Sequence, residues 1–310
     1  MITNFLKIIF FCLIIFNQNN VYSQNFKKSL DREKVADYFS SLISYDSNEN
    51  RQFLNFFESS RFLKDFNNEY VSHYLVALVL EGKITKAINK AKILKAKNVN
   101  ESYESDLLIA INNLKNDEYK KNFFHVNKLN IYKEENKLQS IVLNSLEEYA
   151  HLFYYDEISS KINNNFGHLS IINKAFQNCY LGDKSTKFFF NNVTNSEKGD
   201  YSRYLFFYIN FLISEGKTDE AKIIADKIDI LSSSLLSTQT KDWIDKKKYH
   251  IFKKIFSCKN PQDIIGEFFY LIASLYSTEG DIQKSNFYLK ISNYLNPKFK
   301  FNLSLFVENY

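Results

Sequence analysis

The five histidines are the first residues to test for chemistry, because imidazole is the commonest metal ligand and general base. Only Glu148 and His151 have the Glu-x-x-His spacing that puts two ligands on one face of a helix, and dimetal helical bundles use this pair twice. The sequence has no second such pair, since Glu69 and His73 are four residues apart. An isolated pair is typical of an ordinary helix contact, so we expect no metal and no cofactor.

The motifs of nucleophilic catalysis and nucleotide binding are missing from the sequence. It has no His-Glu-x-x-His helix, no Gly-x-Ser-x-Gly turn and no Gly-x-x-x-x-Gly-Lys-Ser/Thr loop. Cys179 lies in an apolar helical pattern, which favours burial over a nucleophilic role. The sequence therefore indicates that the protein is not an enzyme. A glycan-directed hydrolase or lyase stays open as the alternative, because its two carboxylates could be far apart in sequence.

The charge of the chain does not indicate nucleic-acid binding. The formal net charge of +5 is spread along the sequence, and arginine occurs only at positions 32, 51, 61 and 203. Bidentate recognition of phosphates and bases favours arginine over lysine. We therefore expect no nucleic-acid partner.

Residues 1–23 have the pattern of a signal peptide. Lys7 precedes an apolar run from Ile8 to Phe16, and Ser23 and Gln24 flank the expected cleavage site. The run is shorter than the roughly 20 apolar residues that span a membrane. We expect export to a bacterial-type periplasm; the alternative is an uncleaved anchor in the inner membrane, with the protein facing the periplasm.

Cleavage would leave Cys179 and Cys258 as the remaining cysteines. An oxidising compartment allows a disulfide. Both cysteines, however, lie in apolar helical patterns, where a free cysteine behaves as a small hydrophobic residue. We expect them to be unpaired and keep a disulfide as the alternative, because geometry and not the number of cysteines decides.

The composition favours helices as the elements that position these residues. The chain of 310 residues is 45% hydrophobic, which is ample for a core, and has only seven glycines and two prolines. Tight β-hairpin turns depend on such residues, so a many-stranded protein is disfavoured. The sequence predicts an all-α fold.

Four glycines mark a repeat. Gly82, Gly182, Gly216 and Gly280 are 100, 34 and 64 residues apart, close to three, one and two units of 33 to 34 residues. Apolar helices are expected before them, at 69–80, 168–181, 202–214 and 267–278, and amphipathic helices after three of them, at 83–97, 217–231 and 281–295.

Each glycine is explained by the reversal of the chain between two helices. A helix that stops and turns back within about three residues needs a left-handed residue at its C-terminal end, and glycine adopts that conformation without strain. Five residues later the second helix passes closest to the first, which explains the small residues Ala87, Ala221 and Ser285.

This pattern resembles the tetratricopeptide repeat (TPR). The last unit matches best, with Ala273, Tyr276, Gly280, Ser285, Leu289 and Pro297 at the family positions. The resemblance covers residues 33–297 in a degenerate form: the signature tryptophan is missing, and Asn122 and Lys187 replace alanines. It implies an α-solenoid, a right-handed superhelix of stacked antiparallel hairpins, over residues 24–310.

Several segments depart from the regular repeat. Residues 33–66 are expected to form a first pair with a turn at Asp46 to Asn48, and residues 138–166 an irregular pair. One long basic helix, a break at Asn260-Pro261 and a change in superhelix geometry are expected within 232–262. After Pro297 a single helix remains, so the last repeat is incomplete and could self-associate through its open end.

The concave face of such a superhelix would bind the partner. Because first helices line that face, the resemblance implies groove candidates at Phe176, Tyr180, Arg203, Phe206, Asn210, Glu267, Tyr270 and Ser274. The alternative is that these aromatic residues pack between neighbouring repeats. We expect a non-enzymatic scaffold that binds a protein or peptide in the cell envelope.

Overall fold

The computed structural model describes residues 32–47, 49–60, 68–97, 102–133, 137–160, 166–195, 202–230 and 233–309. The predicted signal peptide, residues 1–23, lies outside these ranges. The described residues form helices and connections without any β-strand, so the all-α prediction is confirmed for them. They belong to two compact units, one ending at residue 63 and the other beginning at residue 64.

The first unit is one helical hairpin. Helix α2 (Arg32–Asp46) packs on α3 (Asn50–Ser59), with Phe53 and Phe57 buried between them. The amide of Glu49 donates to the carbonyl of Ser44 at 2.8 Å and closes the turn between the helices. The predicted pair and its turn are confirmed, although the second helix ends earlier than expected.

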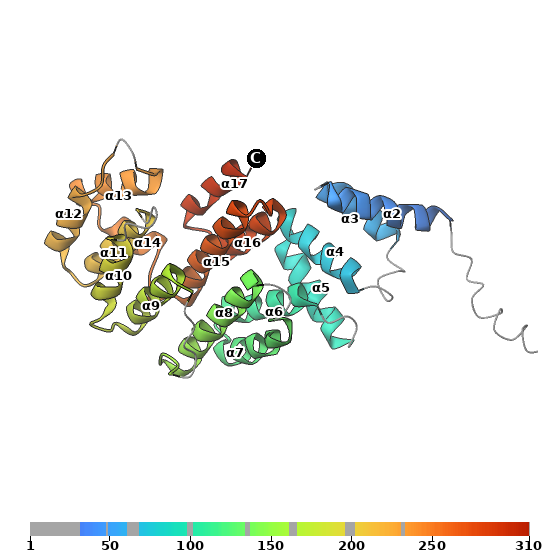
Figure 1. The fold of residues 1–310 in the computed structure, drawn as a ribbon, viewed down its shortest axis with the longest axis horizontal. Coiled ribbons are helices and arrows are strands. Elements are labelled where there is room, and N and C mark those ends of the chain that lie inside the picture. Colours follow the sequence, from blue (N-terminus) through green and yellow to red (C-terminus); the bar gives the residue numbers. More distant parts are fainter. Residues whose placement is uncertain are drawn as a thin grey trace, which may run out of the picture. The chain divides into compact units, whose positions relative to one another are not determined.

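The second unit contains the remaining helices (Figure 1). They are α4 (Asn68–Leu80), α5 (Ile84–Ala96), α6 (Tyr103–Lys115), α7 (Tyr119–Lys128), α8 (Lys137–Tyr155), α9 (His168–Leu181), α10 (Thr186–Thr194), α11 (Arg203–Ser214), α12 (Thr218–Asp226), α13 (Leu235–Asp245), α14 (His250–Ile255), α15 (Pro261–Thr278), α16 (Ile282–Leu295) and α17 (Ser304–Glu308), with 3₁₀ turns η2 (Leu129–Tyr132) and η3 (Lys300–Leu303). None of the described helices is both long enough and apolar enough to cross a membrane.

One backbone turn recurs at the ends of the first helices. Gly82, Gly182, Gly216 and Gly280 have positive φ, as predicted, and Asp117 and Lys247 adopt the same conformation. At each turn the next amide donates to the carbonyl five residues before it, as from Lys217 to Leu212 at 2.8 Å. Residues 82, 117, 182, 216, 247 and 280 are 35, 65, 34, 31 and 33 residues apart, so Asp117 and Lys247 keep the period where glycine is absent, whereas the left-handed Asp156 after α8 lies outside it.

Two predictions about irregular segments are wrong. The basic segment after residue 232 forms two helices, α13 and α14, because the left-handed Lys247 turns the chain between them. Residues 138–155 belong to one continuous helix, α8, and the described residues up to 160 contain no second helix. The predicted break at Asn260-Pro261 is confirmed: Asn260 caps α15 and Pro261 is its first residue.

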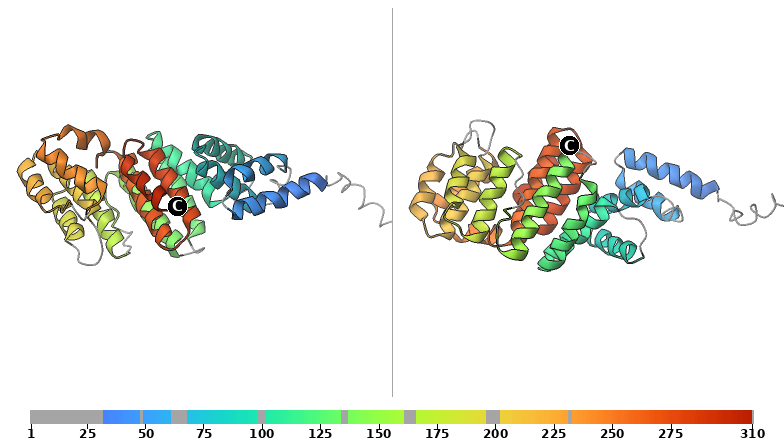
Figure 2. Two further views of the ribbon diagram at one scale, coloured as in Figure 1. Left: turned by 90° about the horizontal axis from the view of Figure 1, so that it is seen from above. Right: turned by 60° about the horizontal axis from the view of Figure 1, so that its bottom comes forward.

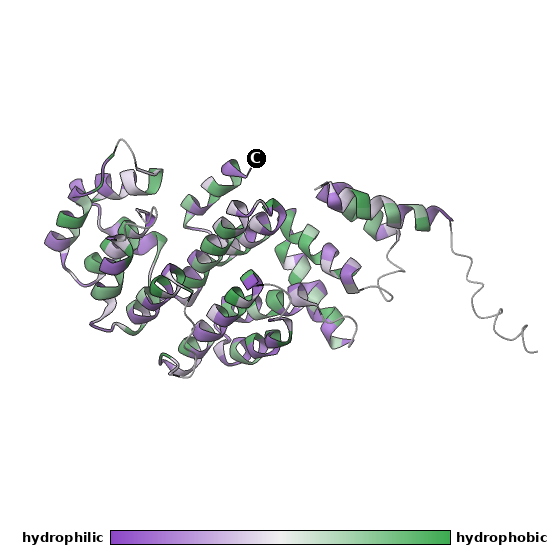
Figure 3. Ribbon diagram, in the orientation of Figure 1, coloured by the Kyte–Doolittle hydropathy of each residue, from purple (hydrophilic) through white to green (hydrophobic). Residues whose placement is uncertain are grey.

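Helices that follow one another in sequence pack together through most of the unit, which confirms an α-solenoid. Contacts join α4 to α5, α5 to α6, α6 to α7, α7 to α8, and α9 through α13 in order. Hydrophobic and hydrophilic positions are interleaved along these helices, as amphipathic packing requires (Figure 3). Ala87, Ala221 and Ser285 have no exposed surface, and their role at the close helix crossings stays a prediction.

The C-terminal hairpin does not extend the stack at its end. Helix α16 packs on α4 and α5, and α15 contacts both α6 and α9, so the hairpin lies between the α4–α8 and α9–α14 segments (Figures 1 and 2). The hydroxyls of Tyr103 and Tyr288 are 2.8 Å apart, and Lys115 Nζ donates to the carbonyl of Leu295 at 2.8 Å. The linear order expected from the repeat is therefore wrong for this hairpin.

The segment after Pro297 folds back onto α11 and onto the same hairpin. Phe299 is buried against Phe206 and Phe207, and Asn309 Nδ2 donates to Ser285 Oγ at 2.9 Å. One short helix, α17, follows the last hairpin, as predicted, and it packs on α16. Self-association through this end stays a prediction.

The cysteines are paired, contrary to our expectation. Cys179 near the end of α9 and Cys258 in the connection before α15 form a disulfide with Cα atoms 5.6 Å apart. Both are buried, as the apolar patterns predicted. The pairing depends on the return of the chain to α9 after 79 residues, and local sequence patterns do not show that return.

Candidate binding groove

Four of the predicted groove residues lie in the interior. Phe176, Phe206, Asn210 and Glu267 are each at most 4% exposed. Asn210 Nδ2 donates to the carbonyls of Phe252 and Phe256 at 3.1 and 3.2 Å and so ties α11 to α14. These residues pack within the protein and do not line an open surface, so their prediction as groove contacts is wrong.

Arg203, Glu267 and Tyr270 do come together, but as an internal ion pair. Arg203 Nε and Nη2 each donate to a carboxylate oxygen of Glu267 at 2.7 Å, and Nη2 also donates to Asn302. The guanidinium lies 3.7 Å from the centre of the Tyr270 ring. Burial lowers the pKa of Arg203 and the charge of Glu267 raises it; the effect of Glu267 prevails, so Arg203 stays charged.

The last two predicted groove residues are half-buried and separate from this cluster. Tyr180 Oη donates to Asp156 Oδ1 at 3.3 Å, and its carbonyl accepts a hydrogen bond from Lys259 Nζ at 2.6 Å. The carbonyl of Ser274 accepts from the hydroxyl of Thr278 at 3.0 Å. The structure therefore does not join the eight predicted residues into one binding surface.

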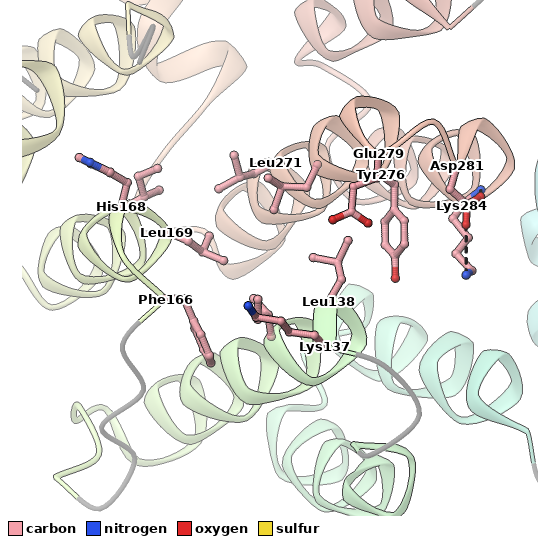
Figure 4. A pocket seen from close by; sticks show the side chains of 13 residues that line it. Lys137, Leu138, Phe166, His168, Leu169, Leu271, Tyr276, Glu279, Asp281 and Lys284 are labelled. Carbon is pink, nitrogen blue, oxygen red and sulfur yellow. Dashed lines mark hydrogen bonds and ion pairs between the residues drawn. The ribbon is translucent and has the colours of Figure 1, made fainter. Parts of the chain in front are cut away.

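A different groove opens between α8, α9, α15 and the start of α16 (Figure 4). Its volume is about 760 Å³, within the range of pockets that bind small ligands or a short run of side chains. Its lining residues are Lys137, Leu138, Ile141, Phe166, His168, Leu169, Ile172, Leu271, Leu275, Tyr276, Glu279, Asp281 and Lys284.

Helices α8 and α15 meet at Tyr149 and Phe268 and line opposite walls of the groove. The rings of Tyr149 and Phe268 are 5.9 Å apart where the two helices meet. Further along, Leu138 and Ile141 come from α8 and Leu271 and Leu275 from α15, and all four are half-buried. Leu169 and Ile172 of α9 add to the apolar lining. The groove therefore has an aliphatic floor.

Charged side chains surround this floor. Lys137 comes from the α8 wall and Glu279 from the end of α15, while Lys284 Nζ pairs with Asp281 Oδ2 at 3.1 Å (Figure 4). Asp281 also caps α16 by accepting the amide of Lys284 at 3.0 Å. Burial, with the nearby charges of Asp281 and Glu279, raises the pKa of Tyr276 to about 12, so its hydroxyl stays protonated.

The sequence analysis did not predict this groove, although one predicted residue of α15 lies next to it. Ser274 was predicted, and it lies between Leu271 and Leu275, which line the groove. The family pattern indicated the wrong face of the helix, because α15 packs between two parts of the stack. The available signal was the absence of glycine between Gly82 and Gly167; the left-handed residue at the end of α8 is Asp156, 39 residues after Asp117.

The groove suits apolar binding better than metal chemistry. The described residues contain no cluster of three histidine, cysteine, aspartate or glutamate side chains that could hold a metal ion. Glu148 accepts a hydrogen bond from Gln177, and the ring of His151 packs on Tyr155 at 4.7 Å.

Comparisons with known protein families, with curated proteins and with solved structures find no match.

Proposed function

We propose that the protein is a non-enzymatic scaffold that holds an apolar segment of a protein or peptide partner in the groove between α8 and α15. The observation that carries this proposal is an open groove of about 760 Å³ with an aliphatic floor and a charged rim. Apolar surface rimmed by polar groups is typical of interaction sites on soluble proteins.

The groove is large enough to give useful affinity. Burying one leucine-sized side chain contributes about 1.5–3 kcal/mol, so three such side chains contribute roughly 5–9 kcal/mol before the cost of association. Association itself costs at least about 4 kcal/mol. This leaves at most about 5 kcal/mol, and rim charge pairs add about 0–1 kcal/mol each, so three such side chains give at best an affinity of tens to hundreds of micromolar, which suits a reversible partner.

Export of the protein is part of the proposal. The Cys179–Cys258 disulfide fits an oxidising compartment, and structural disulfides are rare in the cytosol. Together with the signal-peptide pattern of residues 1–23, it supports a location in the periplasm, either free or attached by an uncleaved leader. The recurring left-handed turn at 31 to 35 residues supports the resemblance to tetratricopeptide repeats.

Selection from a display library of random peptides of about 15 residues, or four helical turns, tests the function. The full chain is compared with Ile141→Glu, which puts a charge on the half-buried groove wall, and with Ile223→Glu, a control on α12 where the side chain is already 62% exposed. We expect apolar peptides that bind the wild type and the control alike and lose roughly tenfold or more on Ile141→Glu. Equal binding to all three proteins contradicts the proposal.

The glycan-directed enzyme remains the competing function. Glu279 and Asp281 are the carboxylates that line the groove, and Asp281 is held by Lys284 and by the start of α16. Retaining and inverting glycosidases both need two carboxylates beside the scissile bond. If the protein turns over cell-wall glycan fragments and Glu279→Gln abolishes this turnover, the enzyme hypothesis replaces the scaffold hypothesis.

A further inference from the structure

Among the described residues, helix α8 is not followed by the second helix that the other first helices have. Left-handed turns at Gly82, Asp117, Gly182, Gly216 and Gly280 each lead directly into a second helix, as α15 leads into α16. The 19-residue α8 also ends at a left-handed residue, Asp156, 39 residues after Asp117, but residues 156–160 that follow it are not helical. Within the described residues no second helix of its own repeat covers α8.

The missing partner leaves apolar side chains of α8 uncovered. In α15, Phe269 and Tyr276 stack on Tyr288 of α16 at 5.6 and 5.4 Å, so the second helix covers the first. In α8, Leu138 and Ile141 instead line the open groove and are half-buried. The groove therefore lies beside the one first helix that, in the described part of the chain, is not followed by a second helix of its own repeat.

The two long walls have the spacing that fits another helix. Leu138 and Ile141 are three residues apart on α8, and Leu271 and Leu275 are four residues apart on α15. Rows with these spacings form the ridges between which the side chains of a packed helix insert. An extended peptide alternates its side chains between opposite faces, so it would turn only half of them toward the floor.

We propose that the groove binds an amphipathic α-helix of a partner protein, which lies along α8 and supplies the covering that the missing second helix would give. This inference rests on the proposed function. The apolar row of the bound helix, at positions i, i+3 or i+4 and i+7, fills the floor between α8 and α15.

The rim charges define the flanks of that helix. Lys137 lies on the α8 wall and Glu279 on the α15 side, and neither forms an ion pair with the other described residues, whereas Asp281 and Lys284 pair with each other. A complementary helix carries an acidic residue on the flank beside α8 and a basic residue on the flank beside the end of α15. This arrangement sets the orientation of the helix in the groove.

The test uses the full chain and a synthetic peptide of about 16 residues, roughly 24 Å of helix, labelled at its N-terminus. The peptide has leucines at the spacing of the floor, glutamates on one flank and lysines on the other. A control peptide has the same sequence with two central residues in the D configuration, which keeps composition and hydrophobicity but disfavours the helix. Binding is measured by fluorescence anisotropy and helicity by circular dichroism.

We expect the D-substituted peptide to bind at least about tenfold more weakly than the parent. Ile141→Glu should weaken the parent by a similar factor, and the exposed control Ile223→Glu should leave its binding unchanged. Lys137→Glu should weaken the parent by roughly threefold or more and bind a charge-reversed peptide more tightly than the wild type does.

The outcomes separate this inference from the function beneath it. If both peptides bind equally and Ile141→Glu weakens both, the inference of a bound helix is wrong and the proposed scaffold function stands. If library peptides bind in the groove but neither designed peptide does, the inference of a bound helix is also wrong and the scaffold function again stands. Binding that does not depend on Ile141 overturns both. A dimer that Ile141→Glu dissociates, or displacement of the peptide by palmitate alone, assigns the groove to a second copy or to a lipid and overturns the partner helix.

Discussion

Replacement of Glu267 by leucine should destabilise the protein strongly, because it leaves Arg203 buried without its partner. The two side chains are only 2% and 16% exposed, and two hydrogen bonds of 2.7 Å join them. Removing one member of a buried ion pair costs about 3–5 kcal/mol, whereas an exposed pair contributes about 0–1 kcal/mol. We expect Glu267→Leu to lower the free energy of unfolding by about 3–4 kcal/mol.

A double-mutant cycle separates the buried charge from the loss of packing. Arg203→Met keeps apolar contact with Tyr270 and Phe299, the rings that the guanidinium now covers. The double variant with Glu267→Leu replaces the ion pair by hydrophobic side chains, which is often nearly neutral. It should therefore be more stable than Glu267→Leu alone by about 2 kcal/mol.

Urea unfolding followed by tryptophan fluorescence measures these differences. Trp243 is the only tryptophan, and its ring packs on Phe252 and Phe301 at 5.6 and 6.1 Å. Phe252 stacks in turn on Phe206 of α11, so the signal reports on the region of the ion pair. The control is Glu220→Gln, which removes an exposed pair with Lys187 and should leave the stability nearly unchanged.

Two results would refute the reasoning. If Glu267→Leu costs no more than the exposed control Glu220→Gln, the buried guanidinium does not depend on this carboxylate. If the double variant loses as much stability as the two single variants together, the two side chains are not coupled and the pair does not join α11 to α15.

Two further predictions concern Asp263 and the disulfide. Burial raises the pKa of Asp263 from 3.8 to about 6, although the amide of Ser257 lowers it, so the folded protein binds this proton more tightly and loses stability as the pH rises through that range. Asp263→Asn should remove this loss and exceed the wild type by about 1–2 kcal/mol at pH 7, with no gain near pH 4, in urea titrations at both pH values. A wild type that is as stable as the variant at pH 7 would contradict this. The Cys179–Cys258 disulfide closes a loop of 79 residues, so its reduction should lower the free energy of unfolding by about 3–4 kcal/mol. The Cys258→Ser variant should have a stability that does not change with dithiothreitol. If the wild type also keeps its stability in the reductant, the disulfide does not form.

The sequence by itself determined the helices and the turns between them, because these depend on neighbouring residues. The apolar runs before Gly82, Gly216 and Gly280 became first helices, and each glycine took the left-handed conformation that reverses the chain. The local signal failed where aspartate or lysine holds the same conformation. Lys247 divides a segment that its basic composition made look continuous.

Only the tertiary structure decided where the C-terminal hairpin lies and where the groove opens. A stacking rule places each repeat beside the one before it, but α15 and α16 return to α4, α5 and α6. This return buries Glu267 against Arg203, brings Cys258 to Cys179 and aligns Leu271 with the uncovered wall of α8. These contacts join residues that are far apart in the chain, and no local periodicity specifies which helix faces fit together. Shape and burial across the whole unit select them.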